Sequence, residues 1–245
     1  MIDTITSIKE NKFLLGTDLV TRNYARTDDE ETFLNNLRTQ PAEWRYRTSP
    51  VNYTLNSQNY RTKPFEEINW SESVVIFGCS MVFGVGLDDS ETIDSAFYNL
   101  TGIPAVNMGS CSTSMMFSLY NSAILNKNYP TPRAVVQLWT GLNRCTYFSP
   151  YKILNYGSWN FEEPYNQHWN QDDSHAKTNA LFSQMISKQL WQDKTNYYEA
   201  SAFVTTVDAL GCDMLTNIDY SRDLAHPGHR SAEITAGIIA DKLKL

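Results

Sequence analysis

The chain has few cysteines, and none of them lies close to another in the sequence. They are Cys79, Cys111, Cys145 and Cys212. Structural zinc sites and disulfide-stapled domains need paired or regularly spaced cysteines, so the sequence predicts neither of them. Free thiols in a reducing compartment are the expected state, and the cytoplasm is the default expectation for location.

A targeting or membrane-spanning segment is missing as well. The opening stretch MIDTITSIKENK shows no basic start followed by an apolar run, which is the pattern of a secretory signal. The most apolar stretch, residues 74–87, is too short to cross a bilayer and is interrupted by three glycines. No membrane span is therefore predicted.

Positive charge is in deficit. The chain carries 20 Lys and Arg against 27 Asp and Glu, which gives a formal net charge of −7 at pH 7. Binding to nucleic acid or to an anionic membrane usually needs a basic face, so neither partner is expected. An acidic balance identifies no partner by itself.

Residues 1–70 are polar and mixed, with no internal repeat and no low-complexity linker. We interpret them as an N-terminal arm packed on the core of a domain that spans 71–245. Within the arm, the run at 27–30 suits the N-terminal cap of a helix over 29–39. The alternating pattern of 51–62 predicts a short hairpin, in which Asn59 suits a left-handed backbone position.

From residue 71 onward, short apolar runs alternate with helical patterns. Strands are predicted at 73–77, 105–108, 133–139 and 212–215, and helices at 89–100, 112–126, 174–199 and 231–243. This alternation predicts a parallel sheet with helices on both faces. Between 140 and 211 the best strand candidate is 202–207, which suits a helix equally well, so four or five strands are expected.

A serine, a histidine and a carboxylate occupy positions that suit nucleophilic catalysis. Ser80 directly follows the first predicted strand, where N–H groups at a helix start would point at its hydroxyl. That hydroxyl needs a base to take its proton, and His226 can serve. Asp223 can bind the other ring nitrogen and fix the tautomer. Ligands of parallel sheets bind beyond the carboxyl ends of the strands, so these side chains are expected to meet there.

A further residue near a predicted strand end is a candidate donor to an oxyanion. Asn143 follows the third strand and offers a side-chain amide, which backbone N–H groups could assist. Such donors stabilise the negative oxygen that forms when a hydroxyl attacks a carbonyl carbon.

Four blocks of the sequence, in this order, resemble the motifs of the SGNH (GDSL-like) hydrolase superfamily. They are GCS at 78–80, NMGSCS at 107–112, GLNR at 141–144 and DLAHPG at 223–228. The family patterns at these places are GDS, a glycine block, GxND and DxxHP. The stretch YTLNSQNYRT is also similar to an N-x-x-G-F-R preface of some members. The resemblance covers about 73–243 and implies a flavodoxin-like three-layer α/β sandwich that hydrolyses esters without a metal or organic cofactor.

The chain departs from the family pattern at three positions. Cys79 replaces the aspartate that follows the first glycine. Ser112 occupies the usual place of the oxyanion glycine, so the resemblance implies its backbone N–H as an oxyanion donor, with that of Gly109 as the alternative. Arg144 replaces an acidic residue, which puts a positive charge near the expected cleft. These departures keep a second interpretation open, in which the fold is a non-catalytic binding or assembly module.

Several of these residues also have plainer interpretations. Ser80 alone would suit a helix cap, and Asp223 with His226 would suit a turn and a surface position. A metal site that adds His229 is disfavoured, because Pro227 interrupts the spacing and no fourth ligand is evident. Cys79 is interpreted as a buried packing residue rather than as a thiol nucleophile.

An aromatic-rich loop spans 147–169 and is expected at the rim of the site. Together with Arg144, its residues Tyr147 and Trp159 are candidates for substrate contact, since aromatic rings suit sugars or an acyl pocket. A loop that folds around its own aromatic cluster explains the composition equally well.

The sequence therefore predicts a serine esterase or acylhydrolase that acts on a small ester or an acylated carbohydrate, such as an O-acetyl group on a sugar. An acyltransferase with the same triad is the alternative within the family. Exclusion of water from the cleft would separate the two, and no sequence feature reports it.

Overall fold

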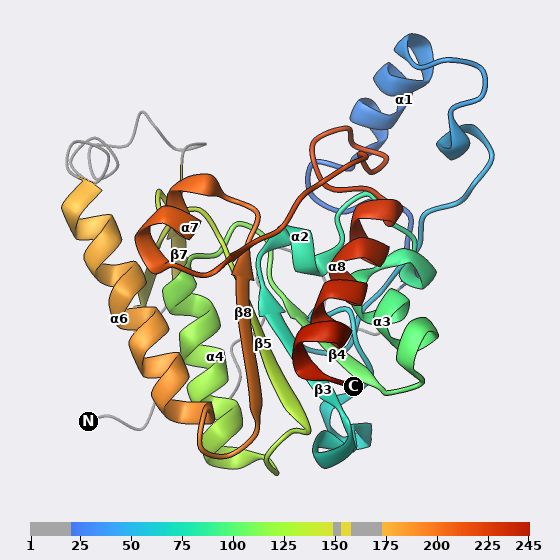
Figure 1. Ribbon diagram of the computed structural model, residues 1–245. Coiled ribbons are helices and arrows are strands. Elements are labelled where there is room, and N and C mark those ends of the chain that lie inside the picture. Colours follow the sequence, from blue (N-terminus) through green and yellow to red (C-terminus); the bar gives the residue numbers. More distant parts are fainter. Residues whose placement is uncertain (1–20, 149–152, 158–172) are drawn as a thin grey trace.

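The computed structural model describes residues 21–148, 153–157 and 173–245. Its central sheet has five parallel strands in the order β4-β3-β5-β8-β9 (Figure 1). They are β3 (Val74–Gly78), β4 (Ala105–Gly109), β5 (Ala134–Trp139), β8 (Asn196–Ser201) and β9 (Asp213–Met214). Two antiparallel pairs lie outside this sheet, formed by β1 (Thr21–Arg22) with β2 (Tyr53–Thr54) and by β6 (Cys145–Phe148) with β7 (Ile153–Tyr156).

Helices cover both faces of the sheet. The α-helices are α1 (Glu30–Thr39), α2 (Ser80–Phe83), α3 (Ile93–Thr101), α4 (Met115–Asn128), α6 (Asp173–Trp191), α7 (Val204–Leu210) and α8 (His229–Leu243). Short 3-10 helices are η1 (Arg45–Arg47), η2 (Phe65–Glu67), η3 (Trp70–Glu72) and η4 (Asp89–Glu91). Helices α3 and α8 lie on one face and α4 and α6 on the other (Figure 1). The predicted layered α/β fold with a parallel sheet is confirmed.

The apolar run of β3 explains why this strand lies inside the sheet. Val74 and Ile76 belong to the core cluster with α3 and α8, whereas Val75 and Phe77 belong to the cluster with α4 and α6. Because both faces of the strand are covered, every one of its residues is buried. The carboxyl end of β3 then delivers the chain directly to Ser80.

The fifth strand lies where the sequence predicted the end of a helix. Helix α6 stops at Trp191, and β8 follows at Asn196–Ser201, so the prediction of a helix over 174–199 is wrong at its end. For 202–207, where strand and helix were both left open, the helix is confirmed, because that segment enters α7 (Val204–Leu210). Strand β8 was missed because its sequence NYYEAS is polar. Its Glu199 carboxylate accepts hydrogen bonds from Trp139 Nε1 (3.2 Å) and Gln184 Nε2 (2.5 Å), which stabilise a charge on a covered face.

The predicted hairpin over 51–62 is wrong as well. Strand β2 pairs with β1, which lies far upstream, and not with a partner inside the same stretch. Asn59 does adopt the predicted left-handed conformation, with φ of 62°. The helix predicted over 29–39 is found as α1, and its cap is the Asp29 side chain, which accepts from Thr32 N at 2.7 Å. The other predicted strands and helices are found with shifted ends.

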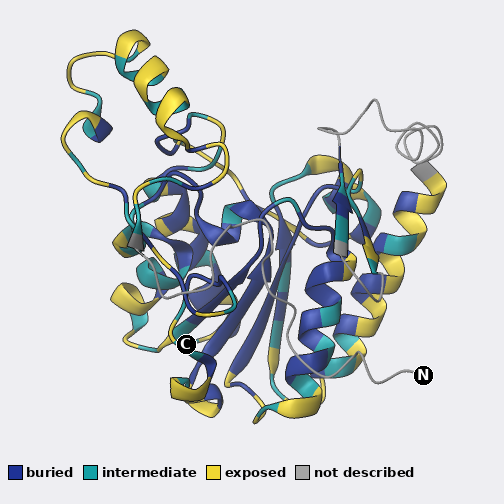
Figure 2. Ribbon diagram, turned by 180° about the vertical axis from the view of Figure 1, so that it is seen from behind, coloured by how far each residue is buried: buried dark blue, intermediate teal, exposed yellow. Residues whose placement is uncertain are grey.

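The described part of the N-terminal segment shares its core with the rest of the chain. Tyr60, Phe65 and Trp70 join the cluster on the α4 and α6 side of the sheet. Tyr53 stacks on Phe83 beyond the carboxyl end of β3, with ring centroids 6.1 Å apart. Helix α1, by contrast, has no buried residue and projects from the buried sheet (Figure 2). The division into two parts at residue 70 stays a prediction.

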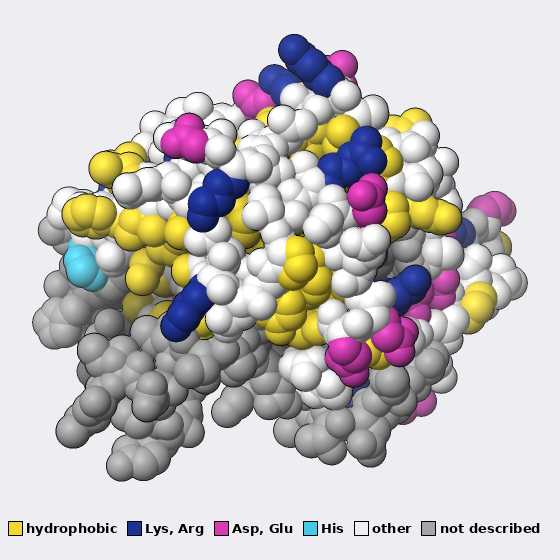
Figure 3. All heavy atoms as spheres, turned by 90° about the horizontal axis from the view of Figure 1, so that it is seen from below, with side chains coloured by type: hydrophobic (Ala, Val, Ile, Leu, Met, Phe, Trp, Pro, Cys, Tyr) yellow, Lys and Arg dark blue, Asp and Glu magenta, His cyan; other side chains and the backbone are white. Residues whose placement is uncertain are grey.

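The surface at the amino ends of the strands shows no single sign of charge among the described residues. Figure 3 views this face from below, and basic and acidic side chains are interspersed there among apolar and uncharged ones. Of the helices in the described ranges, none is long and apolar enough to cross a membrane.

Candidate active site

The turn after β3 presents Ser80 as the first residue of α2. The turn is tight, since a Cβ added to Gly78 would lie 2.3 Å from Val82 Cγ2. Helix α2 ends at once, at Gly84 with φ of 77°, a conformation that favours glycine. Ser80 is therefore held rigidly between a buried strand and a single helical turn, and it is itself only 7% exposed.

Ser80, His226 and Asp223 form one continuous chain of hydrogen bonds. His226 Nε2 lies 2.9 Å from Ser80 Oγ, and His226 Nδ1 lies 2.7 Å from Asp223 Oδ2. If Nδ1 carries the proton that the carboxylate accepts, Nε2 is free to accept the serine proton. The three side chains that the sequence singled out thus meet at one place, although 146 positions separate the serine from the histidine.

The carboxylate of Asp223 is held by five donors. Oδ1 accepts from Ser221 Oγ at 2.8 Å and from the backbone N–H groups of Ala225 and His226, each at 3.0 Å. Oδ2 accepts from His226 Nδ1 and from Thr27 Oγ1, the latter at 2.6 Å. Burial raises the pKa of Asp223, but the hydrogen bonds and the charge of His226 outweigh it and hold this pKa well below the usual range. The group is therefore an anion at neutral pH.

A tight loop in front of α8 carries both the acid and the base. Tyr220 forms a β-bridge with Pro227, and Ser221 N donates to His226 O at 2.9 Å, which closes the loop. Leu224 at its tip has a left-handed backbone with φ of 58°. This closure brings Asp223 and the ring of His226 to the same side of the loop.

The two backbone donors predicted near β4 differ in their surroundings. Gly109 N donates to Asn107 Oδ1 at 3.0 Å, and a Cβ on Gly109 would lie 2.2 Å from Phe83 N. This glycine therefore permits close contact with α2, and its amide is already engaged. Ser112 has a left-handed backbone with φ of 58°, and its Oγ accepts from Arg26 Nη2 at 2.7 Å. We retain Ser112 before Gly109 as the candidate oxyanion donor.

The remaining predicted residues lie in the loop after β5 and beyond it. Asn143 is exposed, and its Oδ1 would lie 3.0 Å from a Cβ on Gly141. Arg144 lies over the ring of Phe203, at 5.8 Å from its centroid. Tyr147 is 55% exposed on β6. Trp159 lies outside the described residues, and the roles of all these side chains stay predictions.

Cys79 is a buried free thiol next to the candidate nucleophile. Burial raises its pKa, but the positive charge of Arg144 contributes to a lowering that prevails, so the net pKa of Cys79 lies below its ordinary value. The imidazole of His226 nevertheless bonds to the hydroxyl of Ser80. No group of three His, Cys, Asp or Glu side chains in the described ranges is arranged to hold a metal ion, and His229 lies instead 3.4 Å from Asp219 Oδ2.

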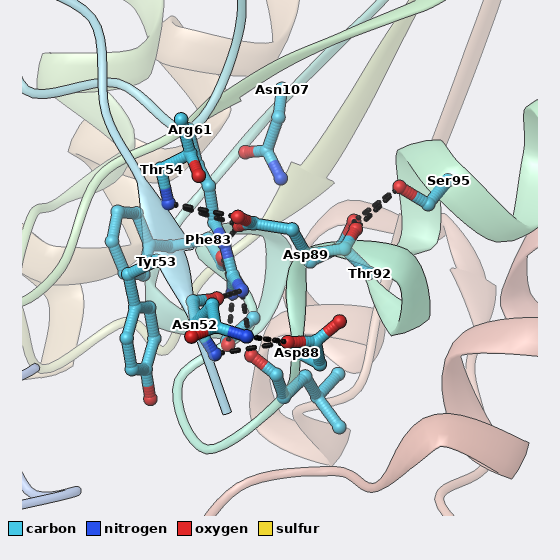
Figure 4. A network of polar contacts seen from close by, with 12 residues as sticks. Asn52, Tyr53, Thr54, Arg61, Phe83, Asp88, Asp89, Thr92, Ser95 and Asn107 are labelled. Carbon is cyan, nitrogen blue, oxygen red and sulfur yellow. Dashed lines mark hydrogen bonds and ion pairs between the residues drawn. The ribbon is translucent and has the colours of Figure 1, made fainter. Parts of the chain in front are cut away.

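Sequence reasoning missed the residues that brace this site from behind. Arg61 is 4% exposed, and all its guanidinium nitrogens donate hydrogen bonds, most of them to the end of α2 and the segment that follows it (Figure 4). Its acceptors are the carbonyl oxygens of Asn52, Phe83, Gly84 and Leu87 and a carboxylate oxygen of Asp89, at 2.6–3.2 Å. The signal was present in the sequence, because Arg61 matches the arginine of the family's N-x-x-G-F-R preface.

Thr27 and Asp28 were missed for a different reason. The sequence assigned them to a helix cap, whereas Thr27 donates to Asp223 and Asp28 forms a buried ion pair with Arg222. No local pattern marks these partners, since almost 200 positions separate them. The position of Arg222 directly before the acid was the only available signal.

A small cavity adjoins the site. Its volume is about 30 Å³, and its wall includes Cys79 and Met81 on either side of Ser80 and Pro227 next to His226. Most of its other wall residues are apolar, with Leu138 and Trp139 at the end of β5 among them.

No family model matches the sequence, and no curated protein matches it. Solved structures do resemble the chain. A carbohydrate acetylesterase family member from Sinorhizobium meliloti is 11% identical over 71% of this chain and 100% of its own, with a TM-score of 0.43. A carbohydrate esterase family 2 enzyme from Corynascus thermopiles is 12% identical over 71% and 67%, with a TM-score of 0.44. The SGNH-hydrolase family esterase AlinE4 is 14% identical over 73% and 97%, with a TM-score of 0.36.

These likenesses do not by themselves assign a family to this chain. At such identities and TM-scores they assign neither an activity nor a substrate to this chain. The chemistry of the site has to be argued from its own side chains.

The close contact at Gly109 gives a first prediction. Gly109→Ala would place a methyl group against the backbone of α2, so we expect a loss of about 1–3 kcal/mol in the free energy of unfolding, measured with urea. Gly237→Ala is the control, because nothing lies within 4 Å of that position in α8, and it should stabilise the protein by up to about 1 kcal/mol. Equal stability of the two variants would contradict the assigned packing.

The low pKa of Asp223 gives a second prediction, on stability and pH. Because the folded pKa lies below the unfolded value of about 3.9, ionised Asp223 stabilises the fold above that pH, and this contribution is lost as the pH falls through the folded pKa. Asp223→Asn should therefore lower the free energy of unfolding by about 1–3 kcal/mol at pH 7. In urea titrations from pH 7 to pH 3 the difference from wild type should shrink below about pH 4. A constant difference would contradict the assignment.

Proposed function

We propose that the protein is a serine hydrolase of carboxylic esters, with Ser80 as nucleophile, His226 as general base and acid, and Asp223 as the group that orients the imidazole. The observation that carries the proposal is the unbroken hydrogen-bonded chain Ser80–His226–Asp223. A serine hydroxyl is a poor nucleophile until a base is within hydrogen-bond reach, and 2.9 Å satisfies that condition.

The reaction proceeds through an acyl-enzyme. Ser80 Oγ attacks the ester carbonyl carbon while His226 Nε2 takes the hydroxyl proton, and a tetrahedral oxyanion forms. The intermediate collapses, the bond to the alcohol oxygen breaks, and His226 returns the proton to the leaving alcohol. A water molecule then attacks the acyl-enzyme with His226 again as base, and the carboxylic acid leaves as Ser80 recovers its proton.

The negative oxygen needs donors that already point toward it. We assign this role to the backbone N–H of Ser80 at the start of α2, the backbone N–H of Ser112 and the side-chain amide of Asn143. One donor of this kind contributes roughly 3–4 kcal/mol to transition-state stabilisation. The guanidinium of Arg26 holds the Ser112 side chain at 2.7 Å, which supports a fixed backbone at that position.

We further infer that the acyl group is short. Cys79 and Met81, on either side of Ser80, and Ser231 of α8 line a cavity of about 30 Å³, which is room for about two water-sized groups. The methyl group of an acetyl ester fits such a space, and an octanoyl chain does not. The exposed ring of Tyr147 in the hairpin after β5 suits contact with a sugar, so an O-acetyl group on a carbohydrate is the substrate class we favour.

Labelling with a fluorophosphonate probe tests the proposed nucleophile. Wild-type protein should be labelled at Ser80, and Ser80→Ala should lose both labelling and ester hydrolysis while its thermal unfolding stays unchanged. Ser118→Ala is a matched control, because Ser118 is as buried as Ser80 but lies on α4. The Ser118→Ala variant should be labelled at the wild-type rate. Folded wild-type protein that resists the probe would overturn the proposal and favour a binding module.

A panel of esters tests the inferred acyl group. The kcat/KM should fall by about tenfold or more from acetyl to octanoyl esters of one alcohol, since each misplaced methylene costs about 1–3 kcal/mol. Met81→Ala removes part of the cavity wall and should raise the rate with butyryl esters relative to acetyl esters. The control Met116→Ala changes an exposed side chain on α4 and should leave the ratio unaltered. A wild-type preference for long chains would refute the assignment of this cavity.

A further inference from the structure

Consecutive residues near the N-terminus contact both sides of the candidate active site. A tight turn is closed by Ala25 N donating to Asp28 O at 2.9 Å and by Asp28 N donating to Ala25 O at 3.1 Å. Arg26 in this turn has φ of 62° and reaches Ser112. Thr27 donates to the triad acid. One turn of the chain therefore contacts both the oxyanion side and the acid side of the site.

A buried ion pair fixes this turn in place. Arg222 Nε donates to Asp28 Oδ1 at 2.8 Å and Arg222 Nη2 to Asp28 Oδ2 at 2.7 Å, so the contact is bidentate. The guanidinium also lies over the rings of Tyr24 and Phe33, at 4.8 and 5.0 Å. Since Arg222 precedes Asp223 and Asp28 follows Thr27, the pair places the threonine hydroxyl directly against the acid.

The two oxygens of the Asp223 carboxylate are held in different ways. Oδ1 takes its three donors from the loop of Asp223 itself, namely Ser221, Ala225 and His226. Oδ2 faces the imidazole, and apart from that ring its donor among the described residues is Thr27. Rotation of the carboxylate about its bond to Cβ is therefore opposed on the catalytic side by a residue from the other end of the chain.

We propose that Thr27 is a positioning residue of the triad, which holds Asp223 Oδ2 in the direction of His226 Nδ1. The N-terminal segment would then complete the active site and not merely cover the core. This inference rests on the proposed ester hydrolysis. Support comes from the 2.6 Å hydrogen bond, from the hydroxyl's place beside the oxygen that binds the imidazole, and from the ion pair next to it.

At position 27 the proposed role needs a hydroxyl that can donate a hydrogen bond, and the shape of the side chain alone is not sufficient. Valine has the shape of threonine but offers no donor, and serine keeps the donor but loses the methyl group. Asp28 and Arg222 are untouched by either change, so the turn should stay docked. The effect of the hydroxyl can thus be separated from the effect of the fold.

The test measures hydrolysis of an acetyl ester and the rate of fluorophosphonate labelling. Thr27→Val should lower kcat and the labelling rate by about tenfold, which corresponds to one hydrogen bond to a charged group, and should leave KM unchanged, with the protein still folded at the assay temperature. Thr27→Ser should restore most of the rate. The control Thr48→Val removes an exposed hydroxyl of the same segment and should behave as wild type. Among the described residues, the hydrogen bond of that hydroxyl goes to Arg45 O.

A double variant shows whether Thr27 acts through the acid. In the Asp223→Asn background, Thr27→Val should cause no further loss of labelling rate, because the interaction it removes no longer serves an anion. An additional tenfold loss there, or wild-type rates for Thr27→Val alone, would overturn the inference while leaving the hydrolase intact. Wild-type protein that is not labelled at all would overturn the proposed hydrolase and this inference with it.

Discussion

The ion pair between Asp28 and Arg222 is the interaction on which the candidate site depends most. Both side chains are buried, at 0% and 4% exposure, and a charge in such surroundings is costly unless its partner and its hydrogen bonds are complete. Both charges have further partners here, because Tyr53 Oη also donates to Asp28 and Arg222 Nη2 also donates to the carbonyl oxygen of Asn23. The pair therefore fixes the segment around Asp28 against the loop in front of α8. Asp223 directly follows Arg222 in that loop.

The same network continues to the nucleophile. The Tyr53 hydroxyl accepts from Gly86 N at 2.6 Å, and Gly86 O accepts from Arg222 N at 3.0 Å. The loop after α2 therefore contacts both Tyr53 and Arg222, which together hold Asp28. Arg61 holds the carbonyl groups of that loop from the opposite side (Figure 4). Serine and acid are thus positioned by one connected set of polar groups, which explains how hydrogen-bond distances are kept across segments that meet only in the folded chain.

The sequence predicts the elements and residue positions that are specified by residues close to them in the chain. The apolar run at 73–77 predicted the strand and the turn that presents Ser80, and the DxxHP block predicted that Asp223 and His226 lie together, because neighbouring residues specify each of them. Strand β8 was missed because Glu199 gives it a polar sequence, and its charge is offset by partners from two other elements. The partners of Thr27 were missed for the same reason, since a contact between remote positions leaves no trace in the spacing of either.

The departures from the family pattern also have partners in the structure. The charge of Arg144 acts on the Cys79 thiol, so two substitutions that look unrelated along the chain concern one place beside the nucleophile. Ser112, where the family has glycine, keeps the left-handed backbone that glycine would favour, and Arg26 binds its side chain. Each altered residue thus has a specific partner, while the side chains of Ser80, His226 and Asp223 stay in hydrogen-bond contact, as the proposed hydrolase requires.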